Sequence, residues 1–289
     1  MSDIEFKRVK LNGKVALITG ANSGIGRVTA EELALQGYHV FLACRNHAKA
    51  EAVLQSIRFR SGNSALAEFL PLDLGDLASV KQCAEQFLKK GLALDLLINN
   101  AGLAGTKGVT DSGFEIMFGV CHVGHFLLNK LLMPALDKAD SARVVVVSSK
   151  AHRHLKKFDF GSVRHGTQSI GGMREYAQAK LANILYVKAL SKRFRGSNKS
   201  VYAVHPGIVA TEVWRGLPTF LQPLLKRFMI TAEQGARTTF YCATAPLDEL
   251  SHGGYYDRCK QIDPSQLANN SLLAERLWTE SEHWVARFA

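Results

Sequence analysis

The sequence predicts a single doubly wound α/β domain with a mostly parallel sheet and helices on both faces. Short apolar runs alternate with segments of helical length along the chain, which is the pattern of parallel strands buried by crossover helices. A glycine-rich turn follows the first apolar run. No linker or internal repeat divides the 289 residues. We therefore expect one domain over residues 1–289.

Each predicted strand is a short apolar run, and each predicted helix lies between two such runs. We expect strands at residues 15–19, 39–44, 66–74, 94–98, 143–148 and 200–204. We expect helices at residues 24–34, 48–57, 77–89, 114–136, 175–194 and 232–243. In doubly wound folds the ligand crevice lies at the carboxyl ends of the strands, and the motifs described below fall at such ends.

The composition argues against several classes of protein. The formal net charge is +11, but the densest basic run, residues 153–157, is short and lacks interleaved aromatic residues. We expect a solvated face there and no nucleic-acid partner. The five cysteines are odd in number and have no CxxC spacing, so we expect neither a disulfide framework nor a metal site. His122 and His125 are interpreted as packing residues because no third metal ligand accompanies them.

The amino terminus is polar and lacks the apolar core of a signal peptide. We expect no apolar run to reach the length of a membrane-spanning helix. Together with the cysteine usage, this predicts a reducing, cytoplasmic compartment.

The first strand ends in the turn TGANSGIG, residues 19–26. Glycines allow a tight turn and a close approach of the backbone to a pyrophosphate, while the amino terminus of the next helix offers N–H groups. Such a strand–turn–helix context predicts a Rossmann-type dinucleotide site. Its candidate binding residues are Gly20, Asn22, Ser23, Gly24, Ile25 and Gly26.

The end of the second strand indicates which dinucleotide binds. NAD-binding proteins of this type usually place an acidic residue there for the ribose 2′-OH, whereas this chain has Arg45 and Asn46. Arg45, and also Arg27, can pair with a 2′-phosphate through charge-assisted hydrogen bonds. Solvation at the surface is the alternative role of these arginines. The sequence favours NADP(H).

The third and fourth predicted strands end in further cofactor candidates. Asp73, followed by Leu74, can bind the adenine edge or simply cap the next helix. The fourth strand ends in NNAG, where Asn100, Ala101 and Gly102 let the backbone pass close to a cofactor.

Three residues form a candidate catalytic core. Tyr176 and Lys180 are spaced i, i+4 and therefore share one helix face. A phenol has a pKa of about 10, and we expect a nearby ammonium and an oxidised nicotinamide to lower it. Ser149, at the end of the fifth strand, can hold a substrate oxygen near Tyr176. This arrangement predicts hydride transfer to a carbonyl carbon, with Tyr176 exchanging the proton.

Together these motifs resemble a classical short-chain dehydrogenase/reductase, in the same order over nearly the whole chain. The motifs are TGANSGIG, NNAG, the SS pair, YAQAK and HPGIVAT. The resemblance implies that Ser149 and Tyr176 act on the substrate oxygen and that Lys180 binds the nicotinamide ribose. It also implies that the nicotinamide end contacts Pro206, Gly207, Val209 and Thr211.

Finer motifs resemble the retinol dehydrogenase branch: ACRN, VGHFLL, SSKAH and AKLANIL. That branch oxidises or reduces retinoids, other apolar aldehydes and sometimes steroids, usually with NADP(H). Its members are often anchored in membranes, and we expect no anchor here. Family resemblance suggests a homodimer or homotetramer through the 114–136 and 176–194 helices. A protochlorophyllide reductase shares ACRN, but this chain is short for that group.

One residue departs from the family pattern. The family has Asn where this chain has Cys121, and that Asn helps to hold a water through which the catalytic lysine relays protons. A thiol is too weak a donor and acceptor to replace an amide fully. Three interpretations stay open: a slowed enzyme, a relay rebuilt by another group, or a cofactor-binding sensor without turnover. A role for Cys121 as a catalytic nucleophile is the least favoured interpretation.

The segment of about residues 212–230 is rich in large apolar side chains. In the family the corresponding region closes over the substrate, which here predicts a small apolar carbonyl or alcohol. Ordinary packing on the core is the alternative. Lys226 and Arg227 beside these apolar residues suggest peripheral contact with an anionic membrane.

Overall fold

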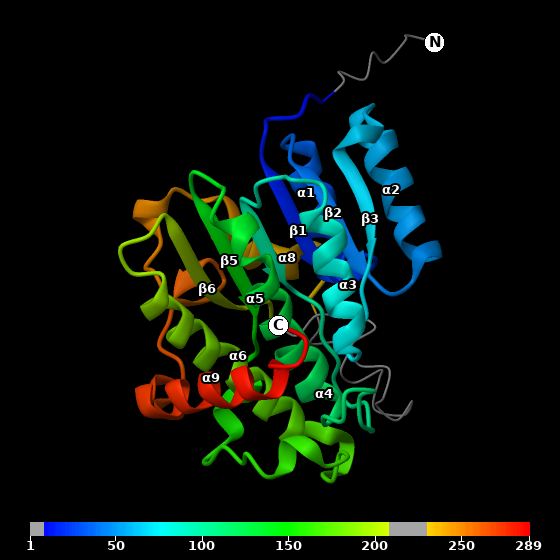
Figure 1. Cartoon of the computed structure of the whole chain (residues 1–289). Helices are drawn as coiled ribbons and strands as arrows, with labels where there is room; N and C mark the ends of the chain where they lie inside the picture. The colour runs from blue at the N-terminus through cyan, green and yellow to red at the C-terminus, as the bar shows by residue number, and fades with distance from the viewer. Residues whose placement is uncertain (1–8, 208–229) are drawn as a thin grey trace.

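A computed structural model describes residues 9–207 and 230–289 of the chain. Its eight-stranded sheet has the order β3-β2-β1-β4-β5-β6-β7-β8 (Figure 1). Every described strand pair is parallel except β7–β8. The strand order reverses between β1 and β4, so the ligand crevice of this fold lies at their carboxyl ends. The predicted doubly wound, mostly parallel sheet is confirmed.

The elements have the following bounds. The strands are β1 (Val15–Thr19), β2 (His39–Cys44), β3 (Ala67–Pro71), β4 (Leu96–Asn99), β5 (Ala142–Val147), β6 (Lys199–His205), β7 (Tyr255–Asp257) and β8 (Lys260–Gln261). The helices are α1 (Gly24–Leu35), α2 (His47–Ser61), α3 (Leu77–Leu88), α4 (Ile116–Phe118), α5 (Gly124–Leu136), α6 (Met173–Arg193), α8 (Ala232–Thr244) and α9 (Ser271–Val285). The shorter turns used below are η2 (Gly119–Val123), η3 (Lys150–His154) and η9 (Gln266–Asn269).

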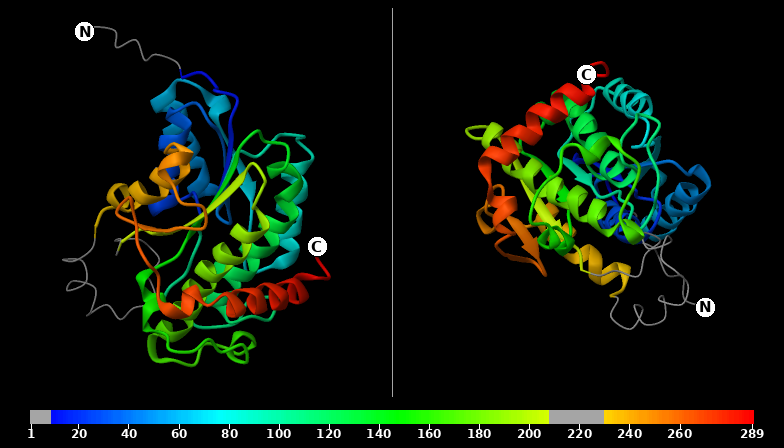
Figure 2. Two further views of the ribbon diagram at one scale, coloured as in Figure 1. Left: turned by 90° about the vertical axis from the view of Figure 1, so that its left-hand side faces the viewer. Right: turned by 90° about the horizontal axis from the view of Figure 1, so that it is seen from below.

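Both faces of the sheet are covered by helices, as Figure 2 shows. Successive strand residues point to opposite faces, so Leu17 of β1 packs in the core with α3, α5 and α6. Its neighbours Ala16 and Ile18 pack in the second core with α1, α2 and α8. Burying one such Leu or Ile side chain contributes roughly 1.5–3 kcal/mol, which explains why the central strands are uninterrupted apolar runs.

The predicted 114–136 helix is not regular. It begins at α4, where the Glu115 carboxylate accepts the N–H of Phe118 at 2.8 Å, and it widens into a π-helical turn at η2 before α5. The stretch Ile116–Leu136 is long and apolar enough to cross a membrane, which corrects the expectation that no run has that length. Because 78% of its apolar window is buried inside the protein, it serves here as a core helix.

The C-terminal elements β7, β8 and α9 are additional to the predicted strands and helices. Helix α9 lies across α6 (Figures 1 and 2). Trp278 of α9 stacks on Tyr186 with a ring separation of 5.8 Å, and its ring edge contacts Phe126 at 5.0 Å. This helix therefore covers part of the two helices that were expected to form an oligomer interface. The oligomeric state stays a prediction.

Candidate active site

The glycine turn between β1 and α1 is closely packed. Gly20 has a φ of +66°, a conformation that glycine adopts without strain. A Cβ atom on Gly26 would lie 2.4 Å from the Gly20 carbonyl oxygen and 2.5 Å from Asn100 Nδ2. The side chain of Ser23 does not cap α1, so the first-turn N–H groups can bind an anion. These features fit a dinucleotide pyrophosphate.

Thr19 ties the glycine turn to the NNAG turn. Its Oγ1 accepts the backbone N–H groups of Asn100 and Ala101, each at 2.9 Å. His125 Nδ1 lies 3.0 Å from the Cys121 carbonyl oxygen, so that nitrogen carries the hydrogen. His125 Nε2, 2.8 Å from Thr19 Oγ1, then accepts the hydroxyl hydrogen. The neutral imidazole joins the cofactor turns to the π turn.

Two buried histidines of this region predict an acid-sensitive fold. Burial lowers the pKa of His122 to about 3 and that of His125 to about 4. Unfolded histidines take up protons below about pH 6.5, so between pH 6.5 and 4 the unfolded state binds more protons and stability falls as the pH falls. For His125 alone the loss reaches about 3 kcal/mol.

Urea unfolding at pH 7, 6, 5 and 4 measures this loss. The His125→Gln variant should have a shallower pH dependence than the native chain. An equal slope in both would contradict the assignment of a neutral, buried His125.

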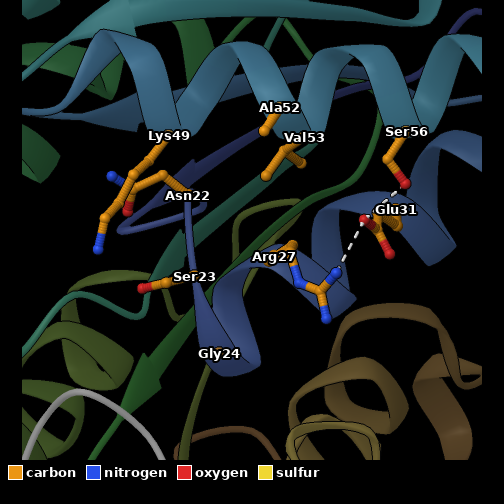
Figure 3. A pocket seen from close by; sticks show the side chains of 9 residues that line it. All are labelled: Asn22, Ser23, Gly24, Arg27, Glu31, Lys49, Ala52, Val53 and Ser56. Carbon is orange, nitrogen blue, oxygen red and sulfur yellow. Dashed lines mark hydrogen bonds and ion pairs between the residues drawn. The ribbon is translucent and has the colours of Figure 1, made fainter.

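A hollow lies between α1 and α2, beside the glycine turn (Figure 3). Its volume is about 340 Å³. The residues that line it are Asn22, Ser23, Gly24, Arg27, Glu31, Lys49, Ala52, Val53 and Ser56. The Arg27 guanidinium lies 3.6 Å from the Glu31 carboxylate, an ion pair that engages Arg27 within α1. Asn46 caps α2, because its Oδ1 accepts the N–H of Lys49 at 2.9 Å.

Arg45 and Asp73, predicted from separate strand ends, lie together. Their side chains form an ion pair at 3.5 Å, and the arginine side chain is 65% exposed. Asp73 also accepts the N–H of Gly75 at 2.8 Å, which turns the chain away from β3. The side chain of Leu74 is buried in the core.

The end of β5 holds α6 through three hydrogen bonds. The Val147 carbonyl accepts from Lys180 Nζ and from Asn183 Nδ2, both at 3.0 Å. One residue later, the Ser148 hydroxyl donates to the Lys180 carbonyl at 2.6 Å. Ser149 comes next, so these bonds fix its position relative to the catalytic face of α6.

Ser149, Tyr176 and Lys180 are brought together as the sequence predicted. The Ser149 hydroxyl is close enough to the Tyr176 phenol to lower its pKa, and Lys180 Nζ lies 5.8 Å from the centroid of the tyrosine ring. Burial raises the pKa of Tyr176, while Lys180 and Ser149 lower it and Cys121 raises it. The rise in the pKa of Tyr176 caused by burial is larger than the lowering caused by the Lys180 ammonium. The phenol is therefore protonated near neutral pH.

Cys121 and Lys180 both lie against Gly102. A Cβ atom on Gly102 would be 3.2 Å from Lys180 Nζ and 3.4 Å from Cys121 Sγ, so both groups pack closely on this glycine. Cys121 is fully buried, and its sulfur lies 3.9 Å from the Leu103 carbonyl oxygen. The thiol thus stands beside the lysine, where the family pattern has an amide.

The nicotinamide end is described in part. Pro206 and Gly207 follow β6, and a Cβ atom on Gly207 would lie 2.5 Å from Ile230 Cδ1. Val209, Thr211 and nearly all of the 212–230 segment lie outside the described residues.

Three contributors to the site were missed by the sequence analysis. Asn183 follows Tyr176 and Lys180 on one helix face at i, i+4 and i+7, a spacing that could have revealed it. The role of Thr19 depends on two backbone N–H groups of another turn and has no sequence signal. His152 contacts the Ser149 carbonyl oxygen through its Nδ1 at 2.6 Å.

Comparison with known proteins gives the family. Residues 14–221 match the family described as short chain dehydrogenase. The chain belongs to the short-chain dehydrogenase family. Retinol dehydrogenase 12 from Homo sapiens is 43% identical over 276 residues, covering 94% of this chain and 86% of that protein.

Solved structures agree with this membership. An uncharacterised protein from Mycobacterium paratuberculosis has a TM-score of 0.77 and 32% identity, with 96% of each chain covered. The NADPH-bound carbonyl reductase from chicken fatty liver has a TM-score of 0.65 and 24% identity, covering 89% of this chain and 100% of that one. The second likeness concerns the fold alone.

Membership in the short-chain dehydrogenase family makes this chain an oxidoreductase of alcohols and carbonyls that uses a nicotinamide cofactor. The resemblance to the retinol dehydrogenase branch is confirmed. The family match ends at residue 221, so α8, β7, β8 and α9 of this short-chain dehydrogenase lie beyond the matched residues.

Proposed function

We propose that this chain is an NADP(H)-dependent reductase or dehydrogenase of small apolar carbonyls or alcohols, of the retinoid, aldehyde or steroid kind. The observation that carries the proposal is the juxtaposition of the Ser149 hydroxyl, the Tyr176 phenol and Lys180 Nζ. A protonated, buried phenol is suited to donate a proton to a carbonyl oxygen. Its partner hydroxyl is suited to hold that oxygen.

Each residue has a defined role in the proposed reaction. When bound, the cofactor supplies or accepts the hydride at nicotinamide C4. Ser149 orients the substrate oxygen, and Tyr176 gives its proton to that oxygen in reduction or takes it in oxidation. Lys180 binds the nicotinamide ribose and favours the phenolate once the proton has left.

NADP(H) is proposed over NAD(H) because of the end of β2. The Arg45 side chain is exposed and lies two residues before the start of α2. Its ion pair with Asp73 is long, at 3.5 Å. A 2′-phosphate, with its greater charge, competes well for such a guanidinium.

The second candidate function is a catalytically weak NADP(H)-binding sensor, and Cys121 is the observation that favours it. The thiol occupies the position beside Lys180, and the Cys121 carbonyl is already bound by His125 Nδ1 at 3.0 Å. A water that used this carbonyl as its acceptor would have to share it with the imidazole. Cytoplasmic location and a homo-oligomer stay predictions. Membrane contact also stays a prediction, because it was inferred from the 212–230 segment, nearly all of which lies outside the described residues.

Turnover separates the two candidates. NADPH oxidation is measured against a panel of apolar aldehydes and ketones for the native chain, Cys121→Asn and the control Cys121→Ala. We expect turnover by the native chain and an increase of about 3- to 10-fold in Cys121→Asn, since proton transfer by positioned groups contributes on this scale or more. Cys121→Ala should show no gain.

The other outcomes have equally definite meanings. Turnover only in Cys121→Asn would favour the sensor, with an intact site and a broken relay. No turnover in any variant that still binds NADPH would contradict the proposed substrate class.

A further inference from the structure

His152 follows Ser149 by three residues, and its fully buried ring bridges two distant parts of the chain. Its Nδ1 lies 2.6 Å from the Ser149 carbonyl oxygen. Its Nε2 lies 3.1 Å from the backbone nitrogen of Ser265. One imidazole therefore connects the turn that carries a catalytic hydroxyl to the segment that precedes η9.

The two contacts determine the tautomer of this imidazole. A carbonyl oxygen can only accept, so Nδ1 carries the hydrogen, and a backbone N–H can only donate, so Nε2 carries the lone pair. Burial lowers the pKa of His152, and the charges of Arg153 and His154 lower it further, against the bond to Ser149. The ring is neutral at physiological pH with both nitrogens satisfied.

Neighbouring residues of the same turn make parallel contacts with the C-terminal segment. Lys150 Nζ pairs with the Asp257 carboxylate at 2.7 Å, and the Arg153 guanidinium donates to the Asp263 carbonyl oxygen. The Tyr255 ring packs edge-on against the His152 ring at 5.3 Å. The turn after Ser149 is thus held by residues 255–265, in the C-terminal part of the chain.

We propose that His152 is a positioning residue, which fixes the Ser149 turn against Tyr176 by tying it to the backbone of Ser265. The inference rests on the proposed function for the role of Ser149. A catalytic group displaced by about 1 Å can cost 100-fold in rate, so a bond that holds this turn controls turnover without touching substrate. A histidine that only filled space would leave the turn in place when its Ser265 bond was removed.

The backbone of Ser265 allows its N–H donor to be removed. Its φ is −66°, close to the value that proline fixes. In Ser265→Pro the Cδ atom replaces the hydrogen that faces His152 Nε2 at 3.1 Å, so the ring loses its bond and must also move back, whereas His152→Asn removes the acceptor without adding atoms. Both Ser265→Pro and Ser265→Ala lose the serine hydroxyl, which accepts the N–H of Ala268 at 3.3 Å. Only the proline variant loses the bond to His152. Ser265→Ala is therefore its matched control.

Two measurements are made on the full chain. In hydrogen exchange, the amides of residues 150–154 should exchange at least about 10-fold faster in Ser265→Pro than in Ser265→Ala. With a substrate from the panel, kcat should fall about 10-fold in Ser265→Pro, while the NADPH Kd changes less than twofold. Equal exchange and equal kcat in the two variants would overturn the proposal.

A second pair of variants guards against a general loss of folding. His152→Asn keeps a side-chain amide that can donate to the Ser149 carbonyl but has no acceptor at the place of Nε2. In that background Ser265→Pro should have little further effect, since the bond it removes is already absent. Full additivity would contradict the proposed bridge. Exchange needs no substrate, so a native chain without turnover would contradict the proposed function and leave this test intact.

Discussion

Tyr176→Phe should lower kcat about 1,000-fold, within the range that a positioned proton donor contributes, and leave the NADPH Kd within about twofold. The ring of Tyr176 packs with Ala104 and Met117, and a phenyl ring keeps these contacts. The hydroxyl is the only group lost, and with it the interaction with the Ser149 hydroxyl. The measurement is steady-state turnover beside NADPH titration by fluorescence.

Tyr186→Phe is the matched control for this variant. Tyr186 lies on the same helix and is also buried, but its ring stacks on Trp278 of α9. It should retain native turnover. An active Tyr176→Phe chain would remove Tyr176 from the role of proton donor, whatever the control did.

Arg45→Asp should weaken NADPH binding about 30- to 100-fold, the cost of a lost charge-assisted bond plus a new repulsion. NADH affinity should change less than about threefold, because NADH has no 2′-phosphate to contact a guanidinium. The new carboxylate would also stand beside Asp73, whose ion pair with Arg45 is lost. Titration of both cofactors measures the ratio.

Arg195→Asp makes the same charge change elsewhere. Arg195 is exposed and lies just before β6, at the opposite end of the strands from the crevice. Arg195→Asp should change the NADPH and NADH affinities only slightly, through the altered net charge of the protein, and added salt should screen that change. Equal losses of NADPH and NADH in Arg45→Asp would remove Arg45 from the proposed 2′-phosphate site.

The sheet could be predicted because burial on both faces leaves a simple sequence signal. The bounds of β2 agree with the apolar run of residues 39–44. The predicted 66–74 strand is shorter, since β3 ends at Pro71 and Asp73 turns the chain. Helix α2 runs past the predicted end at residue 57 to Ser61, where Gly62 with a φ of +64° ends it.

What could not be predicted depends on contacts between distant segments. The π turn of η2 lies where Gly119 packs closely on Thr110, which no local pattern encodes. The role of His152 requires a partner 113 positions away. Helix α9 is different, because Asn270 caps it and its buried residues Ala274, Leu277, Ser281 and Val285 follow a helical spacing. That helix could have been found.

The site includes bonds from the last part of the chain, and this has a consequence for synthesis on the ribosome. Chains fold in large part from the amino terminus as they emerge. The strands β1 to β6, the glycine turn and Tyr176 can all be in place while residues 265 and 281 have not yet left the ribosome. His152 and His122, whose partners are Ser265 and Ser281, would still be unpaired. The nascent chain therefore acquires its nucleotide turn early and its fixed catalytic turn late.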